Sequence, residues 1–441
     1  MKRDIENDIL AWKNRIGRKP LVLMGARQVG KTWLMRDFGR RHFARVHEFN
    51  FDDTPDLASV FEGTKDPIAI LTRLSAISGA KIDVENDVVV LDEIQECGEA
   101  LNALKYFCEK CPKLAVLAAG SLLGVKLRRK RGNPRKLPQT YPVGKVELLN
   151  VEPLSFSEFL QGRNPSLWEF FMSIRGVEPI PEIFHRKLTD EYRLYLMVGG
   201  MPEVVADYID NGDPARVTKL QSDLVALYED DIVKYNGEID AAKILVVLRS
   251  VVPQLAKENG KFIYGALRAG ARGRGYEEAI EWLVSARMVR RVHNVGEIAY
   301  PLAAYEVRNA FKLYMNDVGM LRSAAGVSTE ALALDRDFPF KGRFVENYVL
   351  QQLAGCSEGR VHYYAERADR EIDFVFQHGD VAVPVEVKAG ESKKAASFKS
   401  FVNARHPRYA IRFSERNLRQ DGAFVNIPLY LVSRFAACLV P

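Results

Sequence analysis

One octapeptide near the N-terminus constrains the fold of this chain more than any other feature, because it fits the pattern G-x4-G-K-[ST]. Its residues are Gly25, Ala26, Arg27, Gln28, Val29, Gly30, Lys31 and Thr32. The apolar run Leu21–Met24 precedes it, and a helical pattern follows to about Arg41. This strand–loop–helix setting is what a phosphate-binding loop (P-loop) requires, whereas a flexible glycine turn, the alternative, needs neither flank.

The residue types of the P-loop indicate its chemistry. Its glycines let backbone N–H groups curl around a phosphate, and the N-terminus of the following helix adds partial positive charge. We therefore expect Lys31 to reach the β- and γ-phosphates of ATP, and Thr32 to hold Mg²⁺.

A second apolar run, Val88–Leu91, ends in the acids Asp92 and Glu93. Ligands of parallel sheets bind at the carboxyl ends of strands, and we expect this strand to emerge beside the P-loop. Asp92 would then hold the Mg²⁺ shell, and Glu93 would orient and deprotonate the attacking water. A third run, Leu114–Ala119, leads to Ser121, whose hydroxyl could sense the γ-phosphate; an ordinary Gly-Ser turn is the open alternative.

The order of the apolar runs predicts an α/β fold. Residues 1–155 alternate short apolar runs with amphipathic stretches, which favours a parallel sheet covered by helices. The expected strands are Pro20–Met24, Val46–Phe51, Val88–Leu91, Leu114–Ala119 and Val146–Leu149. The pattern is helical over 156–235, changes to a small helical unit with a hairpin over 236–335, and returns to strands over 336–441.

Four segments carry a resemblance to a known family, namely Gly25–Thr32, Leu91–Gln95, Glu152–Phe159 and Tyr195–Val204. Over nearly its whole length the chain resembles a prokaryotic group of AAA-type P-loop ATPases in which a C-terminal region of unknown function follows the ATPase domain. The first segment is generic to P-loop proteins, whereas the last two are specific to the group. The resemblance implies an AAA-type domain that binds and hydrolyses ATP with Mg²⁺, followed by a helical lid or linker.

One position departs from the pattern of this group. Members carry Gly-Arg before the strand that leads into the Pro-Leu-Ser-Phe segment, whereas this chain has Gly144 and Lys145. Lysine cannot copy the bidentate fork with which arginine contacts phosphate, so the charge-sensing role of Lys145 is in question. Other arginines could serve instead, across a subunit interface, namely Arg128, Arg129, Arg131 and Arg135.

Those arginines belong to a basic loop at residues 126–136. Its cations are Lys126, Arg128, Arg129, Lys130, Arg131, Arg135 and Lys136, and no acid interrupts them. Two interpretations stay open: a contact with the phosphates of DNA, whose affinity would fall steeply in salt, and a mobile solvated loop.

Residues 236–335 resemble a winged helix-turn-helix, with helices over 243–257 and Tyr276–Arg287 and a hairpin of Met288–Val295 with Glu297–Tyr300. Several of its arginines could touch DNA, namely Arg272, Arg274, Arg287, Arg290 and Arg291. Acids on the expected recognition helix would repel phosphates, namely Glu277, Glu278 and Glu281. A DNA reader and a winged helix used only for packing or protein contact are therefore both open.

Two alternating runs, Ile372–Gln377 and Val381–Lys388, predict a hairpin in the last domain. A two-residue turn at His378-Gly379 would set Asp373 opposite Pro384.

Four polar residues of this last domain would then converge. Asp373 and Glu386 would be diagonal neighbours on one face, about 7–8 Å apart at most, with Lys388 on the same face. Glu346, at the margin of the apolar face of a preceding helix, could add a third carboxylate. The set resembles the PD-(D/E)XK nuclease core, as in archaeal Holliday-junction resolvases. This resemblance implies metal binding by the three acids and cleavage helped by the lysine; a solvated sheet face with a salt bridge is the alternative.

The composition of the chain indicates its cellular compartment more clearly than its binding partners. The net charge is +6, from 63 basic and 57 acidic residues, which says little without a local patch. The five cysteines do not suggest a disulfide framework, and the N-terminus does not read as a signal peptide. No stretch is long and apolar enough to span a membrane, so we expect a cytoplasmic protein.

The sequence therefore predicts an AAA-type ATPase that acts on DNA through the basic loop and the winged helix, with a nuclease-like module at its C-terminus. The alternative is a signalling or protein-remodelling NTPase whose winged helix and C-terminal domain bind protein. A homo-oligomer is compatible with either.

Overall fold

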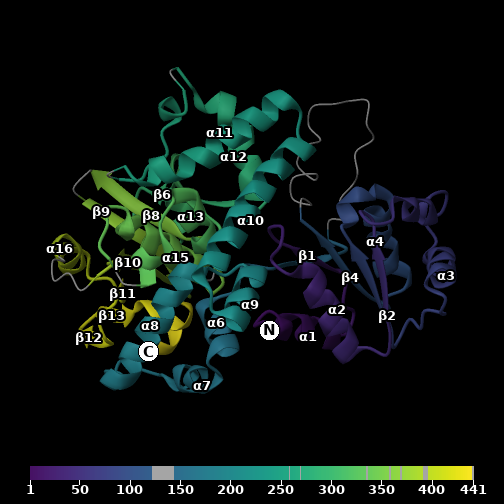
Figure 1. Ribbon diagram of the computed structural model, residues 1–441, viewed down its shortest axis with the longest axis horizontal. Helices are drawn as coiled ribbons and strands as arrows, with labels where there is room; N and C mark the ends of the chain where they lie inside the picture. The colour runs from purple at the N-terminus through teal and green to yellow at the C-terminus, as the bar shows by residue number, and fades with distance from the viewer. Residues whose placement is uncertain are drawn as a thin grey trace. The chain divides into compact units, whose positions relative to one another are not determined.

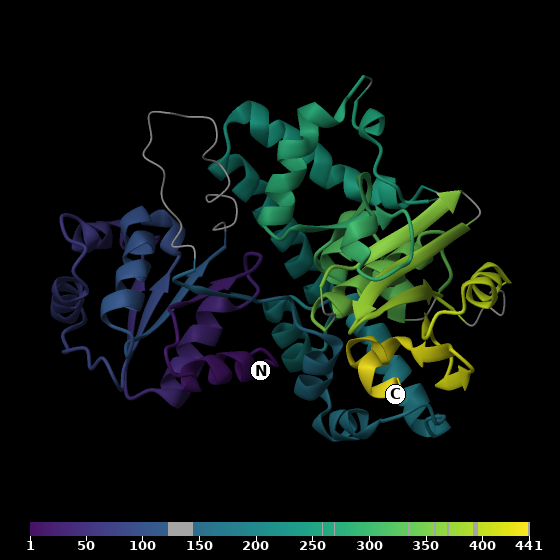
Figure 2. The ribbon, with the colours of Figure 1, turned by 180° about the vertical axis from the view of Figure 1, so that it is seen from behind.

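Two compact units make up the chain (Figures 1 and 2). The N-terminal unit comprises Lys2–Glu152 together with Ser285–Arg287, and the C-terminal unit comprises Pro153–Val284 and Met288–Pro441, with Met1. The computed structural model describes residues 1–121, 144–257, 259–268, 270–333, 336–356, 359–367, 370–390 and 396–439.

A five-stranded parallel sheet forms the centre of the N-terminal unit, in the order β2-β3-β4-β1-β5. Its strands are β1 (Leu21–Met24), β2 (Val46–Asn50), β3 (Val88–Asp92), β4 (Ala115–Gly120) and β5 (Glu147–Asn150). The expected strands are confirmed to within a residue at each end. The central strands β3 and β4 are buried throughout, which is why they appear in the sequence as continuous apolar runs.

Helices cover both faces of this sheet (Figure 1). On one face, α2 (Lys31–His42) packs on β2, β3 and β4, and α1 (Glu6–Asn14) lies beside it. On the other face, α3 (Pro67–Ser78), α4 (Gly98–Lys110) and the 3₁₀ helix η1 (Pro55–Phe61) enclose an apolar core against the strands.

The strand order corrects one expectation, because β4 lies between β1 and β3 and the acidic strand is not directly beside the P-loop. Gly120, at the end of β4, pairs with Met24 at the end of β1. The end of β4 carries only small side chains, at Ala118, Ala119 and Gly120. Apolar runs mark strands but do not encode their order, so the sequence could not show this.

An eight-stranded mixed sheet organises the C-terminal unit, in the order β12-β13-β11-β10-β9-β8-β6-β7 (Figure 2). Strands β10, β11 and β13 run parallel, whereas β9 is antiparallel to both β8 and β10. The strands are β6 (Val289–Val295), β7 (Glu306–Met315), β8 (His362–Arg367), β9 (Arg370–His378), β10 (Val381–Val387), β11 (Ala410–Ser414), β12 (Arg419–Asp421) and β13 (Phe424–Pro428).

Helices precede this sheet along the chain and also connect its strands. The first begins with a capping box, in which Ser155 and Glu158 satisfy each other's backbone N–H groups. The helices are α6 (Phe156–Arg163), α7 (Pro165–Ser173), α8 (Glu182–Val198), α9 (Pro202–Asn211), α10 (Pro214–Tyr235), α11 (Glu238–Leu255), α12 (Gly273–Ser285), α13 (Val318–Ala325), α14 (Thr329–Ala333), α15 (Lys341–Ala354) and α16 (Ala396–Arg405), with the 3₁₀ helices η4 (Tyr264–Ala266), η5 (Leu302–Tyr305) and η6 (Leu429–Cys438). Helix α15 is buried along most of its length against β10, α13 and η6.

None of the helices in the described part of the chain is both long enough and apolar enough to cross a membrane.

The middle region differs from the expected winged helix in its hairpin. The order of α11, α12 and β6 agrees with the expectation, but β6 pairs with β7 at Glu306–Met315 and not with Glu297–Tyr300. Strand β6 also pairs with β8, so the hairpin is part of the large sheet instead of a projecting wing. The regions expected separately at 156–235, 236–335 and 336–441 accordingly form one compact unit.

The hairpin of β9 and β10 differs in register. Val381 pairs with His378, so Gly379 and Asp380 form the turn. Continued along the strands, this pairing sets Asp373 directly against Glu386 and not against Pro384. The difference is two residues, and side chains alternate with a period of two, so every side chain stays on its expected face.

Candidate functional site

The P-loop joins β1 to α2 within the N-terminal unit. Gly30 has a φ of 86° directly before α2, and Gln28 has a φ of 64°. Turns that alternate left-handed and right-handed residues build the concave row of amides that binds anions. Gly25 has no room for a side chain, because a Cβ there would overlap the carbonyl oxygen of Val151.

Lys31 lies folded against this loop. It is only 6% exposed, and its Nζ donates to the carbonyl oxygens of Gly25 at 3.2 Å and Ala26 at 2.8 Å. Burial lowers the pKa of Lys31 to about 8, although the charges of Glu93 and Asp92 act in the opposite direction. A phosphate would supply the full counter-charge that neutral carbonyls do not.

Thr32 and Asp92 meet across the end of β4, where Oγ1 of Thr32 donates to Oδ2 of Asp92 at 2.6 Å. Burial raises the pKa of Asp92, and the bond from Thr32 partly opposes that shift. A hydroxyl and a carboxylate are hard oxygen ligands, and Mg²⁺ takes one or two of these together with water and phosphate oxygens. The donor set therefore fits a magnesium ion that arrives with a nucleotide.

Glu93 is held by three neighbours. Its φ of 47° is uncommon for a residue other than glycine, and its N–H donates to Oδ1 of Asp92 at 3.0 Å. Its carboxylate accepts hydrogen bonds from Nε2 of Gln95 and from Oγ of Ser121, the latter at 3.3 Å. The hydroxyl that we expected to face the γ-phosphate thus bonds Glu93 here.

The candidate sources of a charge-sensing cation are Lys145 and the arginines of the basic loop. Lys145 forms an ion pair with Glu109 of α4 at 2.9 Å, so its charge is already compensated. The basic loop at 126–136, with its four arginines, lies outside the described residues.

The C-terminal unit brings Glu346, Asp373, Glu386 and Lys388 together from α15, β9 and the end of β10. Oδ2 of Asp373 accepts a hydrogen bond from the N–H of Val387 at 2.7 Å, and Nζ of Lys388 lies 3.1 Å from Oε1 of Glu386. Burial raises the pKa of Asp373 to about 7, and the nearby charge of Glu346 adds to the shift.

Arginines already hold two of these three carboxylates. Nε of Arg412 of β11 donates to Oε2 of Glu386 at 2.8 Å, and Nη2 of the same arginine forms an ion pair with that oxygen at 2.8 Å. Nη1 of Arg343 contacts both oxygens of Glu346 at 2.9 Å, and the hydroxyl of Tyr314 donates to Glu346 at 3.1 Å. Within the described part of the chain, no three acids, histidines or cysteines are grouped to hold a metal ion. Guanidinium groups therefore already supply a counter-charge to two of the three carboxylates that we expected to bind a metal ion.

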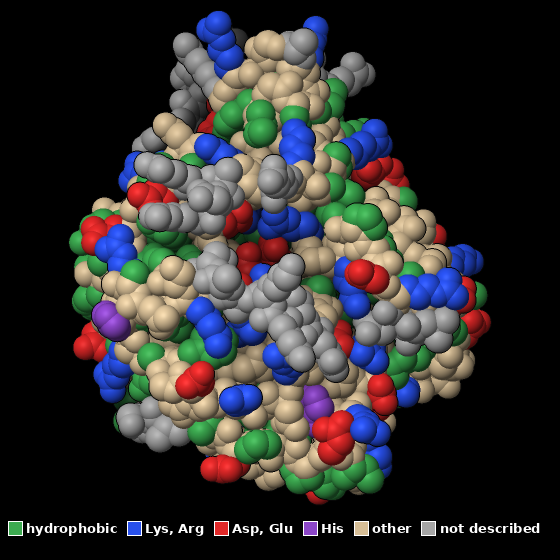
Figure 3. Space-filling model, turned by 90° about the vertical axis from the view of Figure 1, so that its left-hand side faces the viewer, with side chains coloured by type: hydrophobic (Ala, Val, Ile, Leu, Met, Phe, Trp, Pro, Cys, Tyr) green, Lys and Arg blue, Asp and Glu red, His purple; other side chains and the backbone are tan. Residues whose placement is uncertain are grey.

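Arginines of the middle region are also engaged. Arg291 is 9% exposed, and its Nη1 lies 2.7 Å from Glu277 and 3.1 Å from Glu281, two acids that we expected to repel phosphates. Arg287 donates to Oδ1 of Asn150 at 2.6 Å within the N-terminal unit. On the face drawn in Figure 3, coloured side chains of both charges are interspersed.

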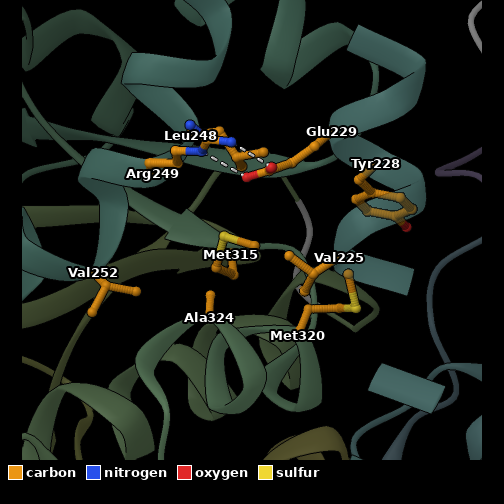
Figure 4. Close-up of a pocket in the computed structure, with 9 residues that line it drawn as sticks. All are labelled: Val225, Tyr228, Glu229, Leu248, Arg249, Val252, Met315, Met320 and Ala324. Atoms are coloured by element: carbon orange, nitrogen blue, oxygen red, sulfur yellow. Dashed lines mark hydrogen bonds and ion pairs between the residues drawn. The ribbon is translucent and has the colours of Figure 1, made fainter. Parts of the chain in front are cut away.

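A cavity of about 170 Å³ lies in the C-terminal unit between α10, α11, α13 and β7 (Figure 4). Its lining residues are Val225, Tyr228, Glu229, Leu248, Arg249, Val252, Met315, Met320 and Ala324. The cation in this lining, Arg249, is paired with Glu229 at 2.6 Å. Such a lining suits an apolar group and not a triphosphate.

Two residues near the nucleotide site had no assigned role in the sequence analysis. Gln95 follows Glu93 by two residues within a segment that carried the family resemblance, and that proximity was the available signal. Arg3 donates from Nη1 to the carbonyl of Val29 in the P-loop at 3.1 Å. It stands far from the motif along the chain, so no pattern could have revealed it.

Family models match three successive parts of the chain. The model of the AAA domain matches residues 17–160. Two models that are each described as a domain of unknown function match residues 189–331 and 341–432. A search of curated proteins gives no match.

Several solved structures are similar to the chain at low identity. The Walker-type ATPase PABY2304 of Pyrococcus abyssi is 14% identical, with a TM-score of 0.45, and the match covers 73% of this chain and 95% of that one. The RuvB Holliday junction branch migration motor of Thermotoga maritima is 14% identical, with a TM-score of 0.30 and coverages of 66% and 90%. AMPPCP-bound DnaA from Aquifex aeolicus is 15% identical, with a TM-score of 0.25 and coverages of 63% and 86%.

Residues 17–160, with the P-loop and the acidic end of β3 in place, are an AAA-type P-loop ATPase domain, and domains of unknown function follow it.

Proposed function

We propose that the chain binds ATP with Mg²⁺ and hydrolyses it at the end of the N-terminal sheet. Lys31 and the amides of the P-loop bind the β- and γ-phosphates, while Thr32 and Asp92 hold the metal ion. Glu93 orients the attacking water and accepts its proton. The observation that carries this proposal is the bond between Thr32 and Asp92, since it joins the P-loop helix to the acidic strand across β4.

The charges around this site support the same proposal. The hydrogen-bond donors to the side chains of Asp92 and Glu93 are hydroxyl, amide and backbone groups, all neutral. Two carboxylates with neutral partners leave negative charge that a divalent cation can offset.

Steady-state ATP hydrolysis with Mg²⁺ and with excess chelator tests the proposal. Turnover should require the metal, and Lys31→Ala should abolish it and weaken nucleotide binding. Lys113→Ala, which removes an exposed lysine paired with Glu85, is the matched control and should keep wild-type turnover. Metal-independent turnover, or full activity of Lys31→Ala, would exclude this site.

We propose that this hydrolysis serves an action on DNA, with the basic loop at 126–136 as the contact to phosphates. The density of cations in that loop, with no acid among them, supports this role. Neutralising Arg128, Arg129, Lys130 and Arg131 together should weaken binding to short duplexes of any sequence and flatten its salt dependence. If the salt dependence of DNA binding does not change in this variant, the loop does not contact DNA.

A protein-directed NTPase is the second candidate, and the pairing of Arg291 with Glu277 and Glu281 favours it. An arginine that is buried and compensated has little charge left for phosphates. The same titration separates the candidates, because the absence of binding to DNA at low salt would favour the protein-directed function.

Phosphodiester cleavage by the C-terminal cluster is the most demanding part of the DNA proposal. Asp373, Glu386 and Lys388 are close together, which supports it, but Arg412 would have to release Glu386 before a metal could bind there. Nicking of branched or single-stranded DNA with Mn²⁺ tests this activity. It should disappear in Asp373→Ala and in Lys388→Ala while ATP hydrolysis continues.

A further inference from the structure

Arg3 reaches the P-loop from the segment before α1. Its side chain is buried, with only 5% of the residue exposed. Nη1 donates to the carbonyl oxygen of Val29 at 3.1 Å, and Nη2 donates to the carbonyl oxygen of Glu152 at 2.7 Å. One guanidinium group therefore ties the P-loop to the end of β5, and all three residues belong to the N-terminal unit.

The hydrogen bond to the carbonyl oxygen of Val29 also fixes the orientation of the Gly30 amide. The C=O of Val29 and the N–H of Gly30 share one planar trans peptide, so they point in opposite directions. A donor that holds this oxygen on one side therefore holds the amide of Gly30 on the other. Gly30 stands directly before α2, where the amides of a P-loop face the phosphates.

Because residue 30 is a glycine, the hydrogen bond from Arg3 is needed to hold the Val29–Gly30 peptide in one orientation. Glycine adopts positive and negative φ values with similar ease, so the peptide before it can rotate at little steric cost. If that peptide turned over, the carbonyl of Val29 would face the phosphates and repel them. A cationic donor on the oxygen opposes this rotation more strongly than a neutral donor would.

The position of Arg3 is itself secured. Its backbone N–H donates to Oε1 of Glu6 at 3.4 Å, and Oε2 of Glu6 accepts a bond from Arg41 of α2 at 2.8 Å. On the other side, the N–H of Val151 donates to the carbonyl of Met24 at 2.7 Å, which anchors the segment that Arg3 grips at Glu152. Lysine could not copy this contact, because its single ammonium group lacks a rigid fork that spans two carbonyls.

We propose that Arg3 is a positioning residue of the nucleotide site, which keeps the amide of Gly30 turned toward the phosphates of a bound nucleoside triphosphate. The proposal rests on the proposed function, since it presumes that the P-loop binds ATP. Arg3 touches the loop backbone and not the reacting atoms, so its effect falls on nucleotide affinity and KM more than on kcat.

Calorimetric titration of the full chain with ATP and with ADP, beside steady-state kinetics, tests the proposal. Arg3→Ala should raise both dissociation constants and KM about tenfold or more, the usual effect of losing a hydrogen bond from a charged donor. Arg3→Lys should restore folding stability but only part of the affinity. Free guanidinium at low concentration should partly rescue Arg3→Ala.

Arg18→Ala is the matched control, because its guanidinium also donates to two backbone carbonyl oxygens of the N-terminal unit, those of Lys13 at 3.2 Å and Lys113 at 2.6 Å, and not to the P-loop. It should lower the melting temperature while KM and both dissociation constants stay within about twofold, because the hydrogen bonds it loses do not hold the loop. Wild-type affinity in both Arg3 variants, or an equal loss in Arg18→Ala, would overturn the positioning role. A wild-type chain that does not bind ATP would overturn the proposed function as well, which makes the two failures distinguishable.

Discussion

Two carboxylate clusters in this chain differ in the groups that surround them. At the end of the N-terminal sheet, Asp92 and Glu93 accept hydrogen bonds from neutral donors, and Lys31 rests on carbonyl oxygens. In the C-terminal unit, Glu386 of β10 and Glu346 of α15 each form an ion pair with an arginine.

The difference indicates which cluster is prepared for a ligand. Neutral donors orient a carboxylate without cancelling its charge, so the first cluster keeps its attraction for a cation. Arginines compensate the charges of Glu346 and Glu386 in the second, and a metal ion would have to displace them. A cluster of acids therefore indicates a metal site only when its counter-charges are known.

Removal of one arginine should expose this difference most strongly. Arg412→Met leaves the buried Glu386 without its main partner, and should lower the free energy of unfolding by roughly 3–5 kcal/mol. Mn²⁺ should recover part of that loss, because the carboxylate becomes available. Denaturant titrations with and without Mn²⁺ measure both effects. Equal protection of the wild-type chain by Mn²⁺ would show that the arginine does not exclude metal.

The corresponding experiment in the N-terminal cluster measures the rate of ATP hydrolysis. Glu93→Gln keeps the shape of the side chain and removes the base, so kcat should fall about a hundredfold or more while ATP still binds. Glu85→Gln, at an exposed acid of the same unit, serves as the control for loss of a charge. Wild-type turnover in Glu93→Gln would show that another group activates the water.

The pH dependence should have opposite directions at the two clusters. The pKa of Lys31 is lowered to about 8, so its cation is lost as pH rises past 8 and ATP affinity should fall about tenfold per pH unit. An unfolded lysine keeps its proton to about pH 10, so the stability of the nucleotide-free chain should instead rise over this window.

At Asp373 the pKa is raised to about 7, and the carboxylate forms only above that pH. Any Mn²⁺ binding there should therefore strengthen as pH rises through 7. Isothermal titrations at several pH values measure both clusters. An ATP affinity that is flat from pH 7 to about 9.5 would mean that the loop does not bind phosphate through the charge of Lys31.

The smallest effect is expected at Ser121. Its hydroxyl donates to Glu93 at 3.3 Å, a long bond between a neutral donor and a carboxylate. Ser121→Ala should lower kcat about two- to tenfold, as for the loss of a single hydrogen bond, and leave ATP affinity unchanged. A larger loss of kcat, together with weaker ATP binding, would indicate that Ser121 contacts the γ-phosphate itself.

The sequence by itself determined the local features of this protein. The P-loop, the acidic end of β3 and the strands of the N-terminal sheet were predictable, because phosphate binding and burial each require particular residue types within a short stretch. The face shared by Asp373 and Glu386 was predictable for the same reason, since alternation survives an error of two residues in register.

Only the tertiary structure decided which distant groups meet. It placed β4 between β1 and β3, brought Arg412 to Glu386 and Arg343 to Glu346, joined β6 to β8, and set Arg3 on the carbonyl of Val29. Such partners stand on different elements, and a charged residue shows the same letter whether or not a counter-charge lies beside it. Strand order and charge compensation depend on packing across the whole chain, so no local pattern contains them.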